Sequence, residues 1–205
     1  MRLNQAVLEK VAEANKQLVA VTKYFSASEL AVFQADLLRE SCVLALGENR
    51  IEVIKQKQIP RQFCHFIGNI QSRNIADIAV HCSVVHSLCK VSHLKKFLQQ
   101  PVCPQFFLQI NVSGEPQKGG LLPEELPLFL AEITDTSLIL GLSAIGAYSA
   151  DALQKQKEFA VLNQLRRDHN PAWKLSAGTS VDYEQALENG VDIVRIGRKL
   201  FGNVV

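Results

Sequence analysis

A lysine stands at the end of a short apolar run near the start of the chain, in the sequence VAVTK, which ends at Lys23. The β-branched residues of this run predict a buried strand over residues 18–22. A lysine in the interior must be paired, deprotonated or covalently used, because burying its charge is costly. On this stretch alone, an ammonium group that emerges into solvent is the better interpretation, whereas a deprotonated amine could condense with a carbonyl group.

Two glycine-containing stretches near the end of the chain could bind an anion. The first, SAGTS, precedes a helix expected to begin near Asp182, and the second, VRIGRKLFG, includes the end of an apolar run. Glycine lets the backbone approach an anion closely, and free N–H groups at a helix start favour negative charge. Small residues also form ordinary tight turns, which is the better interpretation of either stretch alone. The residues concerned are Gly178, Thr179, Ser180, Gly197 and Arg198.

The segments that must position these residues alternate in type along the chain. Short apolar runs are predicted as strands at 18–22, 43–46, 63–67, 84–88, 106–112, 138–145, 174–177 and 193–196. After an opening amphipathic helix, further helices are predicted at 26–38, 50–58, 73–81, 91–99, 123–134, 151–167 and 182–189.

This alternation predicts an α/β fold, a single (β/α)8 barrel of the TIM type with an extra N-terminal helix. We expect one domain over residues 1–205, because no change in composition marks a linker. No helix is predicted after the eighth strand, and the N-terminal helix could cover that gap. A doubly wound open sheet is the alternative.

In such a barrel the C-terminal ends of the strands form the functional face, and a phosphate site is often built after strands seven and eight. Strand one lies beside strand eight, so Lys23 is predicted to face the anion-binding stretches and Arg195. Desolvation and neighbouring cations lower the pKa of a lysine and favour its nucleophilic amine form. The pattern therefore favours a phosphorylated aldehyde: pyridoxal 5′-phosphate (PLP), or a sugar phosphate handled by a Schiff-base aldolase.

Eight motifs in order connect the chain with a known family: AVTK, GENR, HFIGNIQSRN, HSL, QINVSGEPQKGG, GLSAIG, LSAGTSVDYEQAL and VRIGRKLFG. With these motifs, which extend over residues 18–202, the chain resembles the pyridoxal-phosphate homeostasis protein family. Its members are short relatives of the barrel domain of alanine racemase and of eukaryotic-type ornithine decarboxylase. The resemblance implies the fold type III PLP barrel and PLP as the cofactor.

The resemblance also implies roles for particular residues. Lys23 would hold PLP as a Schiff base. Ser180, together with Gly197 and Arg198, falls where the family binds the phosphate, and Arg195 falls where the family places an arginine against the pyridine nitrogen.

Two further positions match residues that line the cofactor pocket of the family, namely Asn49 of GENR and His65 of HFIG. The chain departs from the family at Arg198, where threonine is usual. One hydroxyl contact to the phosphate is therefore replaced by a charged contact, or lost.

The arginine bears on catalysis, because PLP is a strong electron sink only when its ring nitrogen is protonated. Arginine offers only donors and stays cationic, so Arg195 would keep that nitrogen unprotonated. Racemases with this arrangement use a second base from an additional domain and a partner subunit, for which this chain has no room.

We therefore predict a non-catalytic protein that carries or buffers PLP in vitamin B6 homeostasis, with PLP-dependent apoenzymes as candidate recipients. A PLP-dependent amino-acid racemase or decarboxylase of narrow specificity is the alternative.

Composition excludes several other classes of partner. The formal charge is only +2, and Lys and Arg are scattered, so no nucleic-acid surface is expected. No apolar stretch is long enough to span a membrane, and the start MRLNQAVLEK lacks the apolar core of a secretory signal. The five cysteines include no C-x-x-C pair and are predicted to be reduced. We expect a cytoplasmic monomer.

The segment HCSVVHSLCKVSH resembles a metal site only in composition. Its spacings fit no common zinc motif, and a strand through it would send the side chains to different faces. We predict no metal site there, and we expect the other cysteines to be packing residues. The tempting ligands are His81, Cys82, His86, Cys89 and His93.

Overall fold

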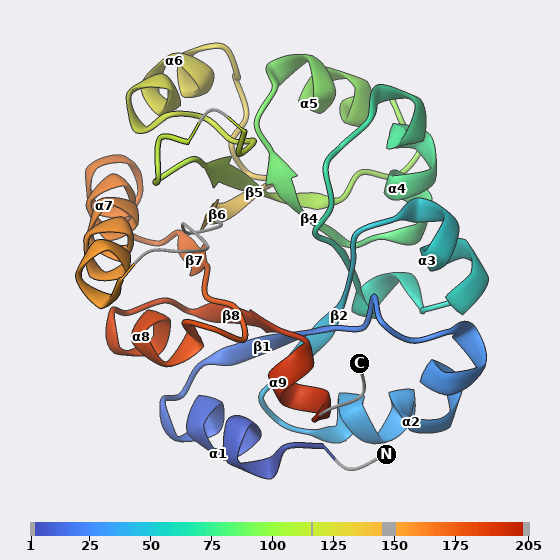
Figure 1. Cartoon of the computed structure of the whole chain (residues 1–205). Helices are drawn as coiled ribbons and strands as arrows, with labels where there is room; N and C mark the ends of the chain where they lie inside the picture. Colours follow the sequence, from blue (N-terminus) through green and yellow to red (C-terminus); the bar gives the residue numbers. More distant parts are fainter. Residues whose placement is uncertain (1–2, 116, 145–150, 203–205) are drawn as a thin grey trace.

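Eight parallel strands form a closed barrel in the computed structural model, which describes residues 3–115, 117–144 and 151–202 (Figure 1). Each strand pairs with the next one along the chain, and β8 closes the ring against β1. The predicted barrel is confirmed, and the alternative of a doubly wound open sheet is wrong. The strands are β1 (Gln17–Val21), β2 (Val43–Glu48), β3 (Cys64–Phe66), β4 (Val84–Leu88), β5 (Gln105–Ile110), β6 (Ile139–Ala144), β7 (Lys174–Ser176) and β8 (Ile193–Ile196).

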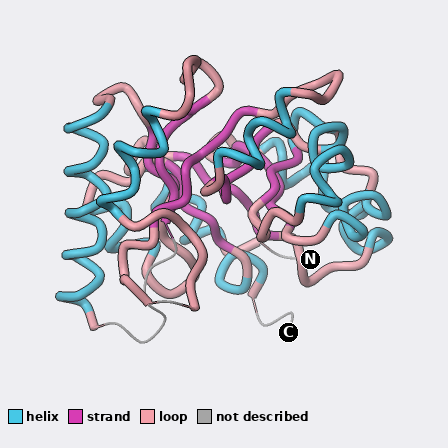
Figure 2. Tube along the Cα trace, turned by 90° about the horizontal axis from the view of Figure 1, so that it is seen from above, coloured by secondary structure: helices cyan, strands magenta, loops and turns pink. Residues whose placement is uncertain are grey.

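Helices surround the barrel and cover the outer faces of the strands, as Figures 1 and 2 show. In the described part of the chain, no helix is long and apolar enough to cross a membrane. The helix predicted from residue 123 begins with a 3-10 turn, Pro123–Glu125, before α6. The helices are α1 (Gln5–Glu13), α2 (Ala27–Arg39), α3 (Ile51–Lys57), α4 (Ile75–His81), α5 (Val91–Leu98), α6 (Leu126–Ala131), α7 (Ala152–His169), α8 (Tyr183–Glu188) and α9 (Arg198–Phe201).

The N-terminal helix α1 covers the place where the barrel closes. It packs against β1 and α9, and in Figure 1 it lies between α8 and α2 in the outer ring. Asn4 ties it to α9, since its backbone N–H donates to Leu200 O at 2.8 Å and its side-chain amide donates to Lys199 O at 3.0 Å. The structure differs from the prediction after β8, because a helix, α9, does follow this strand. Its single turn is too short to produce a helical pattern of apolar residues.

The interior of the barrel has an apolar floor and a polar layer above it. The floor consists of Val19, Val84, Phe107 and Ile193, which pack together as a cluster separate from the main core. Side chains of a strand alternate between its two faces, so the interior residue two positions further along each strand lies nearer the C-terminal end. There the barrel holds buried polar side chains: His65, His86, Gln109, Ser176 and Arg195.

Aromatic packing holds the turn that leaves β1. The ring of Phe25 lies 5.0 Å from that of Phe33 on α2 and 4.7 Å from that of Phe201 on α9, both edge to face. The residue before α2, Ser26, is its N-cap: the Ser26 hydroxyl accepts from the Glu29 N–H, while the Glu29 carboxylate accepts from the Ser26 N–H. This capping box fixes the direction in which the chain enters α2.

A buried ion pair joins α3 to the ends of β1 and β2. The Lys57 ammonium donates to Glu48 Oε1 and, at 2.7 Å, to the carbonyl oxygen of Thr22. The Thr22 hydroxyl donates to the same Glu48 oxygen at 2.6 Å. The side chains of Lys57 and Glu48 are only 1% and 0% exposed. Thr22, the residue just before Lys23, is therefore fixed through both its carbonyl oxygen and its hydroxyl.

We predict that Lys57→Met destabilises the protein by about 3–5 kcal/mol, because it leaves the Glu48 carboxylate buried and unpaired. Urea unfolding measures this change. The matched control is Lys55→Met on the same helix, which removes a half-exposed pair with Asp77 and should cost at most about 1 kcal/mol. Equal losses in the two variants would contradict the account.

Candidate functional site

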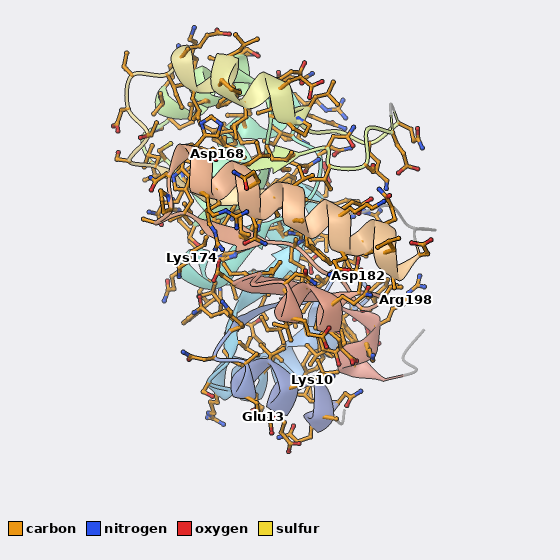
Figure 3. All side chains as sticks on the ribbon, turned by 90° about the vertical axis from the view of Figure 1, so that its left-hand side faces the viewer. Lys10, Glu13, Asp168, Lys174, Asp182 and Arg198 are labelled. Carbon is orange, nitrogen blue, oxygen red and sulfur yellow. The ribbon has the colours of Figure 1, made fainter. Side chains whose placement is uncertain are left out.

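A cavity of about 520 Å³ opens where the strands end. Asp182 and Arg198, which both line the cavity, mark this end of the barrel in Figure 3, and Asp168 and Lys174 mark the opposite end. Small-molecule sites in proteins commonly have volumes of about 300–1,000 Å³, so the cavity can hold a small ligand.

Six of the seven predicted site residues line this cavity. They come from the loops after β1, β2 and β7, from β8 and the glycine that follows it, and from the start of α9, so barrel closure gathers segments far apart in the chain. Their contacts with a ligand stay predictions. The six are Lys23, Asn49, Ser180, Arg195, Gly197 and Arg198.

Lys23 reaches the cavity from an exposed position rather than a buried one. Its Nζ lies 5.2 Å from the centre of the Tyr24 ring, and Cζ of Arg198 lies 5.5 Å from the same ring centre. Such cations are attracted to the aromatic face. A Cβ atom on Gly197 would lie only 3.0 Å from Cε2 of Tyr24, so this ring packs directly on the glycine. Tyr24 also lines the cavity, and its local sequence contains no signal for this position.

The loops after β7 and β8 support each other. Gly178 has φ +81°, and a Cβ there would lie 2.6 Å from Cβ of Ala186, so both the backbone angle and the space require glycine. The N–H and hydroxyl of Thr179 donate to Asp182 Oδ1 at 2.7 and 3.0 Å. Ser180 Oγ accepts from the N–H of Lys199 at 3.3 Å, which links the two loops.

Arg195 is a buried guanidinium fixed by protein oxygens. Its Nη1 donates to the carbonyl and the hydroxyl of Ser176, and its Nη2 donates to Ala144 O at 2.7 Å. Burial lowers the pKa of Arg195 to about 10, so the group stays cationic at neutral pH. Within the described residues, these bonds use three of its five N–H groups, and its side chain lines the cavity.

A chain of buried hydrogen bonds runs from Arg195 across the barrel. Ser176 Oγ lies 2.9 Å from His86 Nδ1, and His86 Nε2 lies 3.0 Å from His65 Nδ1. His86 also stacks on Phe107, with ring centres 4.6 Å apart. Arginine can only donate, so one order satisfies every group: Arg195 to Ser176, Ser176 to His86, and His86 to His65.

The two histidines of this hydrogen-bonded chain, His65 and His86, are neutral at pH 7. Burial lowers the pKa of His65 from 6.5 to about 3. Burial, and then the neighbouring His65 and Arg195, hold the pKa of His86 well below its usual value.

The structure differs from the prediction at His65, which was expected to line the pocket. Its side chain is only 4% exposed and lies in the polar layer below the cavity, where it contacts His86. The HFIG motif reaches the cavity instead through Ile67 and Gly68. His65 faces the barrel interior, and strand periodicity alone cannot say how deep along the axis a side chain lies.

The histidines and cysteines that resembled a metal site are scattered. His86 is bonded inside the barrel, whereas His93 lies on α5. Sγ of Cys82 lies 3.7 Å from Sγ of Cys64, and this contact and burial raise the pKa of the Cys82 thiol, which disfavours the metal-binding thiolate. No group of three or more His, Cys, Asp or Glu in the described ranges could hold a metal ion.

Comparison with known proteins places the chain in a family. The model of the family described as "Alanine racemase, N-terminal domain" matches residues 1–204. The pyridoxal phosphate homeostasis protein of Pseudomonas aeruginosa is 34% identical over 201 residues, which cover 90% of this chain and 83% of that protein. The chain belongs to the pyridoxal phosphate homeostasis protein family.

Solved structures of other proteins show the same fold. PipY of Synechococcus elongatus, in a structure with PLP bound, matches with a TM-score of 0.75 at 24% identity, over 96% of this chain and all of that one. Alanine racemase of Clostridium difficile matches with a TM-score of 0.74 at 15% identity, over 97% of this chain but 56% of the racemase. This pyridoxal phosphate homeostasis family member thus shares its barrel with part of a larger enzyme.

The buried histidines predict a loss of stability in mild acid. Between pH 6.5 and pH 3 the unfolded chain protonates His65 while the folded chain does not, so the free energy of unfolding falls as the pH falls. This histidine alone should make the free energy of unfolding about 2 kcal/mol lower at pH 5 than at pH 7. Urea unfolding at the two pH values, on the wild type and on His65→Gln, measures the difference.

The His65→Gln variant should lose less stability than the wild type between pH 7 and pH 5, since the other histidines contribute to both proteins. Carboxylates stay ionised over this interval and contribute little. Identical losses in the two proteins would show that His65 takes up no proton on unfolding.

Proposed function

We propose that this protein binds PLP through Lys23 and serves vitamin B6 homeostasis as a carrier or buffer of the cofactor. The observation that supports this most is the meeting of Lys23 with Ser180, Gly197 and Arg198 around one cavity. The relative from Pseudomonas aeruginosa is a pyridoxal phosphate homeostasis protein, and PipY has been solved with PLP bound.

The residues of the cavity fit the groups of PLP. The cofactor would supply an aldehyde, and Lys23 would hold it by condensation of its amine with the aldehyde carbon, with loss of the oxygen as water. Ser180 offers a hydroxyl to the phosphate, Gly197 a backbone that lines the cavity, and Arg198 a positive charge. Arg195, whose guanidinium retains N–H groups with no partner among the described residues, suits an acceptor such as a ring nitrogen.

The carrier role is favoured over catalysis by the state of Arg195. Its guanidinium remains charged at neutral pH and is held by Ser176 and Ala144, so it would donate to the ring nitrogen without protonating it. An unprotonated ring withdraws electrons weakly, which suits storage better than carbanion chemistry.

The position of Lys23 favours the release of PLP to another protein. Its side chain is exposed, so an amine of an approaching protein can reach the bound aldehyde carbon without unfolding of the barrel. PLP-dependent apoenzymes are the recipients that this proposal implies.

Reduction with borohydride tests the site. After incubation with PLP, borohydride should fix a pyridoxyl group, and peptide mass mapping should find it on Lys23. Lys23→Ala should lose most of the visible absorbance of the PLP–protein link, whereas Lys96→Ala, which removes an exposed lysine on α5, should retain it. A pyridoxyl group confined to other lysines would refute the assignment.

Assays with a broad panel of amino acids separate the carrier from an enzyme. We expect no Lys23-dependent racemisation or decarboxylation above the rate of free PLP. Robust turnover that disappears in Lys23→Ala would establish the alternative, a racemase or decarboxylase of narrow specificity.

A further inference from the structure

A second lysine, Lys155, lies in the wall of the same cavity. It sits on α7, away from every motif that linked the chain to its family, and its side chain is only 8% exposed. Its Nζ lies 3.9 Å from Oδ2 of Asp182, which is too far for a hydrogen bond. Among the described residues, this carboxylate is its only ion-pair partner.

Asp182 compensates this buried ammonium poorly. Its other oxygen, Oδ1, already accepts from the N–H and hydroxyl of Thr179. Lys57 provides the contrast within the same protein, because its ammonium, also on a buried side chain, donates to two oxygens at hydrogen-bond distance. A buried ammonium without acceptors is costly unless a ligand supplies them.

The charges around the cavity favour an anionic ligand. Among the described residues that line the cavity, four side chains are cationic and a single one, Asp182, carries a carboxylate. A hollow lined mainly by one sign of charge attracts ligands of the opposite sign. The four cations are Lys23, Lys155, Arg195 and Arg198.

We propose that Lys155 is a further anion-binding residue of this site and that its ammonium donates to the phosphate group of the bound ligand from the α7 side. Asp182 then orients the ammonium at a distance and holds Thr179, at the start of the phosphate-binding loop. This inference rests on the proposed function for the identity of the ligand, a phosphate monoester. Inorganic phosphate shares the same chemistry and is the other source of such a group.

The test compares Lys155→Met with Lys155→Arg and with Lys157→Met, a control that removes an exposed lysine two residues away on the same helix. Each protein is titrated with PLP, with pyridoxal, which lacks the phosphate, and with inorganic phosphate alone, at constant ionic strength. Circular dichroism confirms the fold of each variant.

Lys155→Met should weaken the binding of PLP and of inorganic phosphate about 10- to 100-fold, the value of one charge-assisted hydrogen bond. The same variant should bind pyridoxal as the wild type does. Lys155→Arg should retain most of the phosphate affinity, and Lys157→Met should match the wild type throughout.

Unchanged affinity for PLP and phosphate in Lys155→Met would overturn the inference. An equal loss for pyridoxal would also overturn it, because it would show a structural role. If Lys155→Met fails to fold, the phosphate affinity of Lys155→Arg becomes the test. A loss of this affinity in Lys155→Arg would count against the inference. The proposed function fails separately, if PLP forms no link with Lys23 in the wild type while inorganic phosphate still binds in a Lys155-dependent way.

Discussion

The pairing of β1 with β8 is the interaction on which the site depends. It sets Val19 opposite Arg195 and Ala20 opposite Ile196, so the chain leaves both strands at the same rim. Lys23 and Gly197 meet there although they are far apart in the sequence. Because side chains alternate between the two faces of a strand, a shift of this register by one residue would turn Arg195 out of the barrel. Helix α1 covers this seam from outside, and the aromatic contacts of Phe25 secure it from the rim.

A buried charge inside the barrel follows from the same arrangement and must be satisfied there. Arg195 is held by oxygens from β6 and β7, and through Ser176 the bonds continue to His86 on β4 and His65 on β3. The polar layer thus ties together strands on opposite sides of the barrel. Both histidines are neutral, and each can accept at one nitrogen while it donates at the other. These hydrogen bonds therefore fix the side chains of the polar layer without adding charge beneath the cavity. The guanidinium of Arg195 is therefore presented to the cavity in a fixed orientation.

Much of this arrangement could be predicted from the sequence, and the rest depends on contacts that no local pattern contains. Continuous apolar runs predicted the strands, their alternation with helices predicted the barrel, and strand order placed Lys23 beside Arg195. The depth of His65 could not be predicted, because it depends on His86 and on how far each strand rises along the axis. Lys155 was missed because it stands in the polar sequence ALQKQKEF, where only packing against the rim distinguishes it from the exposed Lys157. The four residues of α9 are too few for any periodic signal.

In the proposed site, Lys23 and the loops after β7 and β8 hold one phosphorylated aldehyde between them. The decisive test is a crystal structure of the protein grown with PLP. We expect continuous electron density from Nζ of Lys23 to the aldehyde carbon, with the phosphate against Ser180 and Gly197 and the ring nitrogen facing Arg195. Density for the cofactor elsewhere on the protein, or a phosphate that lies away from these loops, would contradict it.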